Sequence, residues 1–202
     1  MNQIDKTRPA GRPREFDRDE VLDAALSVFS EHGYEATSIS LLSEAMGLTA
    51  GSLYKAFGDK RGVFLAAFER YRQVRGALLE ARLAGCRTGR QAVEEILRYY
   101  ADWSHGEDGR RGCMVVGSAN DLANLDQEAA DRVARAVREN EERILTHIRA
   151  GQADGSVRAD LDAESLARTL LCLTLGMRVV GRTGPDRDAM AATAAIALKL
   201  LD

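Results

Sequence analysis

Proline, cysteine and long apolar runs are scarce in this chain of 202 residues. It has three prolines and little alternation of apolar and polar residues, so helices are favoured over strands. The three cysteines, Cys86, Cys113 and Cys172, are far apart and have neither CxxC nor Cys/His metal spacing. We therefore expect free thiols and no metal. No apolar run could span a membrane and no apolar leader follows Met1, so we expect a cytoplasmic protein without membrane contact.

Sequence patterns typical of enzymes are also missing. We find no nucleophile elbow, phosphate-binding glycine loop, HExxH motif or paired-carboxylate constellation, so we expect neither catalytic residues nor a cofactor. The net charge of −3 argues against nonspecific coating of nucleic acid, but it leaves room for a local basic patch. Alanine, leucine, glutamate and arginine dominate the composition. Together these features predict an all-α protein with one large domain or two small ones.

The stretch SISLLSEAMGLTAGSLYKAF, residues 38–57, predicts two short helices joined by a tight turn. An apolar-patterned segment comes first, a Gly-Leu turn follows at 47–48, and Thr49 can cap the second helix. The second helix carries polar residues at its start and on its outer face, namely Ser52, Tyr54 and Lys55. This pattern favours a helix-turn-helix whose second helix enters the DNA major groove. An ordinary helical hairpin is the alternative.

A basic segment precedes this stretch. Residues 1–14 contain Pro9 and Pro13, which prevent regular structure. Arg12 and Arg14 flank Pro13, and such short arginine elements suit a narrow, A·T-rich minor groove. We expect a flexible arm that seeks DNA, with a solubilising tail as the alternative.

The rest of the chain predicts further helices with recognisable ends. Asp59 and Asp126 are placed to cap helices, Thr88 and Gln91 form a plausible capping box, and Pro185 opens the last helix. The expected helices cover about 17–32, 59–83, 88–104, 113–123, 126–150, 162–182 and 186–201, with loops at 105–112 and 151–160.

The last two predicted helices have little polar surface. The helix over 162–182 is rich in leucine, and the helix over 186–201 is rich in alanine. Because a helix that is apolar nearly all round must be buried, we expect residues 162–201 to pair two copies in a homodimer. Burial within one subunit is the alternative.

The order of residues between positions 24 and 60 carries a family resemblance. The residues are Ala24, Ala25, Phe29, His32, Gly33, Tyr34, Thr37, Ser38, Gly47, Leu48, Thr49, Gly51, Ser52, Leu53, Tyr54, Phe57 and Lys60. In this order they resemble the TetR family of bacterial transcriptional repressors over roughly residues 15–65. The remainder matches mainly in helix number and order.

The resemblance implies an architecture of about nine helices. After the flexible basic arm (1–14), it implies a three-helix helix-turn-helix DNA-binding domain (15–62, motif 38–57) and a helical ligand-binding and dimerisation domain (63–202). It also implies a double-stranded DNA operator and a small-molecule inducer as partners.

The resemblance further implies which residues contact DNA. The implied phosphate-backbone contacts are Ser38, Ser40, Thr49, Ser52, Tyr54 and Lys60, and the implied base-facing residues are Ala50, Gly51 and Lys55. The chain departs from the family at Ala50, where members often carry a larger polar residue, and at Ala56, where a ring is frequent. We therefore expect few direct contacts between side chains and bases, and we expect part of the sequence specificity to come from Arg12, Arg14 and DNA shape.

Gly112-Cys113-Met114 followed by Asn120 resembles a subset of the family in which some repressors sense electrophiles or oxidants with a cysteine at this place. The neighbouring Arg110 and Arg111 would favour a thiolate. A small buried packing residue is the alternative for Cys113. The candidate ligand-pocket residues are Tyr99, Tyr100, Trp103, Cys113, Met114, Asn120 and Met177.

Three functional hypotheses follow. The first is a repressor that binds a two-fold operator as a dimer and is released when an inducer in the C-terminal domain tilts the helix beginning at Asp59. The second is the same repressor switched by modification of Cys113. The third is a helical adaptor that binds only protein. The sequence identifies neither inducer nor operator, and it does not separate repression from activation.

Overall fold

The computed structural model describes residues 16–202, so that Arg12, Arg14 and the rest of the arm lie outside the described residues. The α-helices are α1 (Arg18–Ala36), α2 (Ile39–Ala45), α3 (Ala50–Phe57), α4 (Lys60–Leu83), α5 (Gly89–Asp102), α6 (Gly106–Arg111), α7 (Met114–Asn120), α8 (Gln127–Asp154), α9 (Ala163–Val180) and α10 (Arg187–Leu198). Short 3₁₀ turns η1 (Leu122–Asn124), η2 (Gly181–Thr183) and η3 (Lys199–Leu201) follow α7, α9 and α10. The all-α prediction is confirmed.

Side-chain caps fix the starts of most helices. The Oγ1 of Thr49 accepts a hydrogen bond from the backbone N–H of Ser52 at 3.2 Å, and Oδ1 of Asp59 accepts one from Gly62 at 2.7 Å. Asp126 caps α8 in the same way. Each cap satisfies an N–H group that has no partner within its own helix, which is why these boundaries agree with the sequence-based expectation.

Two expected loops are wrong. Residues 106–111 form the short helix α6, whose first turn holds Glu107 and Asp108 and whose last turn holds Arg110 and Arg111. These charges complement the helix dipole. The loop expected from residue 151 begins later, because α8 continues to Asp154.

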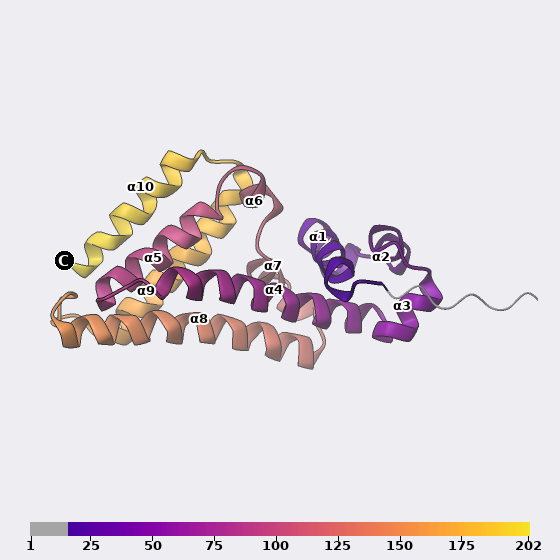
Figure 1. The fold of residues 1–202 in the computed structure, drawn as a ribbon, viewed down its shortest axis with the longest axis horizontal. Coiled ribbons are helices and arrows are strands. Elements are labelled where there is room, and N and C mark those ends of the chain that lie inside the picture. The colour runs from indigo at the N-terminus through magenta and orange to yellow at the C-terminus, as the bar shows by residue number, and fades with distance from the viewer. Residues whose placement is uncertain (1–15) are drawn as a thin grey trace, which may run out of the picture.

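Figure 1 shows how these helices are arranged. Helices α1, α2 and α3 gather at one end, and α5, α9 and α10 lie at the other. Helix α4 starts beside α3 and runs lengthwise between the two ends, with α8 alongside it in the same direction. No helix of the described part is long and apolar enough to cross a membrane.

Two apolar clusters meet along α4 and α8. The first cluster joins α1 to α3, the first part of α4, α7 and the start of α8. The second joins the end of α4, α5, the rest of α8, α9 and α10. Helices α4 and α8 contribute side chains to both clusters. A displacement of one helix against the other would therefore change the side-chain packing in both clusters.

Candidate nucleic-acid interface and ligand cavity

Helix α3 presents a polar, exposed face at the end of the molecule. Its apolar side is fixed by Leu53, which is fully buried, while Tyr54 is half exposed. The Thr49 and Ser52 hydroxyl oxygens lie 3.0 Å apart at the start of the helix. The predicted base-facing residues Ala50, Gly51 and Lys55 are all exposed. This face is therefore accessible to a large partner.

The turn between α2 and α3 depends on one glycine. Gly47 has φ of 62°, a conformation that costs residues with a side chain free energy. The backbone N–H of Leu48 then donates to the carbonyl oxygen of Ser43 at 3.0 Å. At the start of α2, the exposed Ser38 accepts a hydrogen bond from Leu41, and Ser40 is exposed as well. All predicted contacts of residues 38–55 thus lie on exposed parts of the α2 to α3 unit.

Lys60 is placed differently from the other predicted contacts. It is partly buried, and its Nζ donates to the carbonyl oxygen of Tyr34 at 3.0 Å. The same ammonium lies 4.4 Å from the centre of the Tyr34 ring. Lys60 therefore joins the start of α4 to the end of α1.

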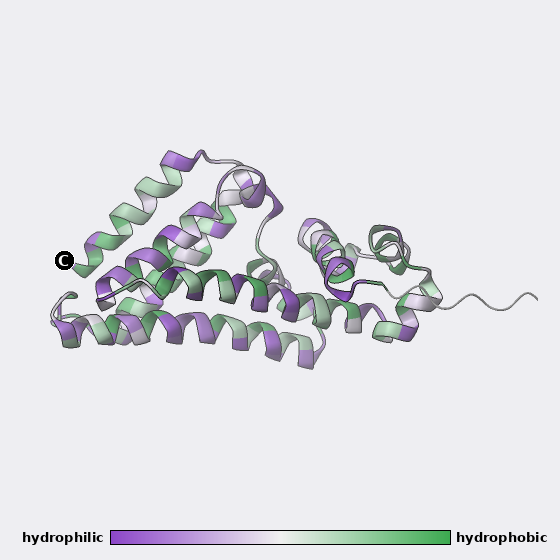
Figure 2. Cartoon of the chain, viewed as in Figure 1, coloured by the Kyte–Doolittle hydropathy of each residue, from purple (hydrophilic) through white to green (hydrophobic). Residues whose placement is uncertain are grey.

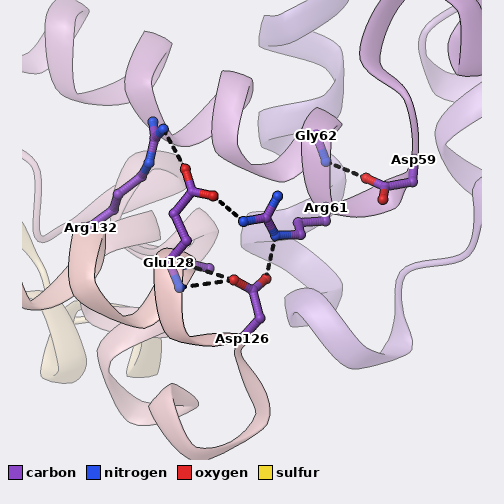
Figure 3. Close-up of polar contacts among 7 residues, drawn as sticks. Asp59, Arg61, Gly62, Asp126, Glu128 and Arg132 are labelled. Atoms are coloured by element: carbon purple, nitrogen blue, oxygen red, sulfur yellow. Dashed lines mark hydrogen bonds and ion pairs between the residues drawn. The ribbon is translucent and has the colours of Figure 1, made fainter.

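A network of ion pairs joins the starts of α4 and α8 (Figure 3). The Nε of Arg61 donates to Asp126 at 2.7 Å, and its Nη2 donates to Glu128. Glu128 also accepts from Arg132. The hydrogen bond from Arg61 holds the pKa of Asp126 below its ordinary value. Two more ion pairs, Arg72 with Glu139 and Glu80 with Arg143, link the same two helices further along.

A cavity of about 80 Å³ lies next to these contacts, and Arg72, Glu139 and Arg143 are part of its lining. It lies among α4, α5, α8 and α9, with further lining from Trp103, Cys113 and Val115. Four predicted pocket residues meet there, namely Tyr99, Tyr100, Trp103 and Cys113. The other three lie outside its lining: Met114 lines a separate hollow beside α1, Asn120 is exposed, and Met177 is buried in the second apolar cluster.

The cavity also contains residues that sequence reasoning missed. Tyr71, Arg75 and Leu79 recur every four residues on one face of α4, and all three line the cavity. Arg178 also lines it and is only 2% exposed. The sequence does mark Arg178 as unusual, because this charged residue interrupts an apolar run near the end of α9.

Cys113 lies at the border of the cavity. The Tyr71 hydroxyl donates to its Sγ at 3.2 Å, and the cysteine is partly buried. Burial, followed by the electrostatic interaction with Cys113, raises the pKa of Tyr71 well above its ordinary value. The tyrosine is thus a neutral hydrogen-bond donor to the sulfur of Cys113, and both residues line the cavity.

The opposite end of the molecule has an apolar surface. Val179 and Val180 are 48% exposed, and Ile196 is 63% exposed. Figure 2 shows α10 coloured mainly green and pale, whereas α8 is banded with purple. A shallow groove on this surface is lined by Leu173, Ala192, Thr193, Ile196, Ala197 and Leu200.

Comparison with known proteins identifies the family. Residues 21–67 match the family described as bacterial regulatory proteins, tetR family, and residues 89–197 match the tetracyclin repressor-like C-terminal domain. The chain belongs to the TetR family. The resemblance found in the sequence is thereby confirmed, and so is the expectation that the protein is a regulator and not an enzyme.

Relatives of this TetR-family chain cover nearly all of its length. The HTH-type transcriptional repressor ComR of Escherichia coli (strain K12) is 32% identical, over 94% of this chain and 91% of ComR. YezE of Bacillus subtilis (strain 168), described as an uncharacterized HTH-type transcriptional regulator, is 28% identical, over 95% of this chain and all of YezE. A cysteine mutant of the TetR family transcriptional regulator CifR, solved in complex with a 26bp double-strand operator DNA, superposes with a TM-score of 0.84. It is 32% identical and the match covers 95% of this chain and all of that one.

Proposed function

We propose that this protein is a DNA-binding transcriptional repressor that binds a two-fold operator as a dimer and is released by a small molecule. The observation that carries the proposal is the exposed polar face of α3, which a glycine turn and a buried Leu53 hold at the end of the molecule. A short helix held in this way fits the major groove. The repressor ComR and the operator complex of CifR support the same function. Operator DNA implies a cytoplasmic place of action.

The proposal divides the chain by task. Residues 1–14 act as a DNA-seeking arm, 15–62 as the DNA-binding domain, and 63–202 as the ligand-binding and dimerisation domain. Helix α4 crosses the boundary at 62/63 without a break, so it can carry movement between the two domains. We assign phosphate contacts to Ser38, Ser40, Thr49, Ser52, Tyr54 and Lys60, and base or groove contacts to Ala50, Gly51, Lys55, Arg12 and Arg14.

Release works through the relative position of α4 and α8. A ligand in the cavity touches both helices beyond the Arg61 to Asp126 ion pair. If the ligand binds better when α4 is tilted, it shifts the population toward a form in which Tyr54 and Lys60 leave their phosphates. The dimer, paired through residues 162–201, would otherwise hold two reading helices roughly 34–36 Å apart, one duplex turn.

Selection of bound duplexes from a random pool tests the DNA-binding function. We expect enrichment of a two-fold sequence with half-sites centred about 10 base pairs apart. A matched selection with Tyr54→Ala should give weaker binding to every sequence, because a phosphate contact carries no sequence information. A wild-type chain that enriches no duplex would instead support the protein-only adaptor.

A second candidate function is a repressor switched at Cys113. It is favoured by the position of Sγ beside the cavity, 3.2 Å from the Tyr71 hydroxyl. Covalent modification of Sγ by an electrophile or an oxidant would enlarge the side chain where α4 packs. We expect Cys113→Ser to lose operator release by such reagents, while Cys172→Ser, which changes an exposed thiol, keeps it. Full release of the Cys113→Ser protein would exclude this switch.

A further inference from the structure

Two arginines in the cavity wall, Arg75 and Arg178, have no carboxylate partner among residues 16–202. Arg178 is 2% exposed, and its Nη2 donates to the carbonyl oxygen of Gly112 at 2.5 Å. Its Nη1 is buried and has no hydrogen-bond partner among residues 16–202. Because a guanidinium stays protonated at any ordinary pH, Arg178 cannot relieve this state by losing a proton.

Arg75, which lines the cavity from α4, also has a buried nitrogen, Nη1, without a partner in the described part of the chain. Its guanidinium carbon lies 3.3 Å from the centre of the Trp103 ring and 5.5 Å from that of Tyr71. Stacking on aromatic faces stabilises a cation, but it leaves the positive charge in place.

The remaining charged residues of the cavity do not neutralise this pair. Glu139 is engaged by Arg72, and Arg143 is engaged by Glu80. The nearby tyrosines stay neutral, because burial raises the pKa of both Tyr99 and Tyr100. The cavity wall thus holds one buried cation, Arg178, and one partly buried cation, Arg75, and burying their charge is costly unless an anion joins them.

We propose that the cavity binds a small organic carboxylate, with the carboxylate between Arg75 and Arg178 and an apolar body against Leu79, Val115 and Leu175. This inference deepens the proposed function by naming the chemical class of the ligand, and its regulatory meaning rests on that function. The forked guanidinium geometry matches the two oxygens of a carboxylate. The apolar walls favour a hydrocarbon body, and the volume of about 80 Å³ limits that body to at most one ring.

Such a ligand would also connect two helices that carry the response. Arg75 belongs to α4, which leads to the DNA-binding domain, and Arg178 belongs to α9, which leads to the apolar surface of α9 and α10. A carboxylate held by both guanidiniums fixes the distance between them. It therefore selects one position of α4 relative to the rest of the ligand-binding domain.

Titration calorimetry on the full chain tests the proposal with benzoate, benzamide and inorganic phosphate. We expect benzoate to bind saturably, and benzamide, which has the same shape without the charge, to bind about tenfold or more weakly. Phosphate, which lacks the apolar body, should also bind more weakly than benzoate. Arg178→Met should lower benzoate affinity by about tenfold or more.

The matched control is Arg168→Met, which changes an exposed arginine of the same helix that pairs with Glu141. We expect it to keep benzoate affinity within about twofold. Circular dichroism checks the folding of each variant, and Arg75→Met provides the same test if Arg178→Met does not fold.

Several results would overturn the carboxylate site. These are no benzoate binding by the wild type, equal binding of benzamide, tighter binding of phosphate, or unchanged benzoate affinity in a folded Arg178→Met or Arg75→Met protein. Benzoate binding that appears only in the Cys113→Ser protein would show that a Cys113 thiolate neutralises the two arginines in the native protein. That result would also overturn the carboxylate site. A chain that binds benzoate but enriches no duplex supports the carboxylate site and refutes the proposed function. A chain that enriches duplexes but does not bind benzoate supports the proposed function and refutes the carboxylate site.

Discussion

The Nζ of Lys60 lies 3.0 Å from the carbonyl oxygen of Tyr34, so the first residue of α4 closes the end of α1. The ammonium also lies over the ring of Tyr34, at 4.4 Å from its centre. The same carbonyl oxygen accepts a hydrogen bond from the backbone N–H of Thr37, the C-cap of α1, at 3.3 Å, and carbonyl groups at a helix end carry partial negative charge that attracts a cation. Lys60 therefore stabilises the junction of α1 and α4 in addition to its proposed contact with a phosphate.

Replacing Lys60 by methionine should lower stability and DNA affinity together. We expect the free energy of unfolding to fall by about 1 kcal/mol, since a charge-assisted hydrogen bond at a partly exposed site is lost. Operator affinity should fall by a similar factor for all duplexes. Denaturant unfolding and binding to a panel of duplexes measure the two effects.

Lys55→Met is the matched control for this prediction. Lys55 is exposed and makes no side-chain hydrogen bond or ion pair among residues 16–202, so stability should change by less than about 0.5 kcal/mol. Its proposed base contact predicts a changed sequence preference instead. A stability loss as large as that of Lys60→Met would refute the distinction between the two lysines.

The Arg61 pair should make stability depend on pH in the acid range. The pKa of Asp126 lies below its ordinary 3.8 because of the hydrogen bond from Arg61, and the pKa of Glu128 lies below 4.5 because of Arg132 and then Arg61. When the folded pKa is the lower one, the contribution is present above the unfolded pKa and disappears as pH falls through the folded pKa. Arg61→Met should therefore destabilise the protein at neutral pH, and this difference should shrink between about pH 5 and about pH 2.

Denaturant midpoints across this pH range measure the effect. Arg98→Met is a suitable control, because within the described part of the chain Arg98 pairs with Glu94 and Glu95 of its own helix and with no residue of α4 or α8. We expect it to leave the link between α4 and α8 intact. A difference between wild type and Arg61→Met that stays constant with pH would contradict this role of the ion pair.

These contacts also show what the sequence could predict. The caps at Ser38, Thr49, Asp59 and Asp126 act on N–H groups two or three residues away, so a local pattern is enough to find them. The family-specific order of residues 24–60 located the DNA-binding unit. The Arg61 pair joins residues 65 positions apart in the chain, and no local pattern reports such a partner.

The cavity was predicted only in part for the same reason. Tyr99, Tyr100 and Trp103 were found because aromatic residues concentrate there, and Cys113 because of its motif. Arg178 was missed because its role depends on burial by other helices. The loop expected from Gly151 was wrong because this glycine lies within α8, where it lets the start of α5 approach closely.

Gly89 and Gly151 mark this close approach, and Gly89→Ala should be strongly destabilising. A Cβ at Gly89 would lie 2.0 Å from the backbone nitrogen of Gly151 and 2.3 Å from the carbonyl oxygen of His147. Backbone atoms cannot move aside as a flexible side chain can, so we expect a loss of about 1–3 kcal/mol in the free energy of unfolding. Thermal and denaturant unfolding measure it.

Gly76→Ala is the matched control, because Gly76 also lies within a helix but a Cβ there would meet nothing within 4 Å. Alanine favours the helix over glycine, so this variant should gain up to about 1 kcal/mol. Equal effects of the two substitutions would contradict the packing of α5 against α8.

Ile196→Glu should separate the proposed dimer. Ile196 is the most exposed large apolar side chain of the described part, and a carboxylate there would have to be buried without a partner if α10 pairs with a second copy. We expect sedimentation velocity to show a monomer, and operator affinity to fall sharply because a monomer contacts only one half-site. Leu122→Glu, a substitution at a 36% exposed leucine in η1, should leave the dimer intact. An Ile196→Glu protein that stays dimeric would exclude this surface as the interface.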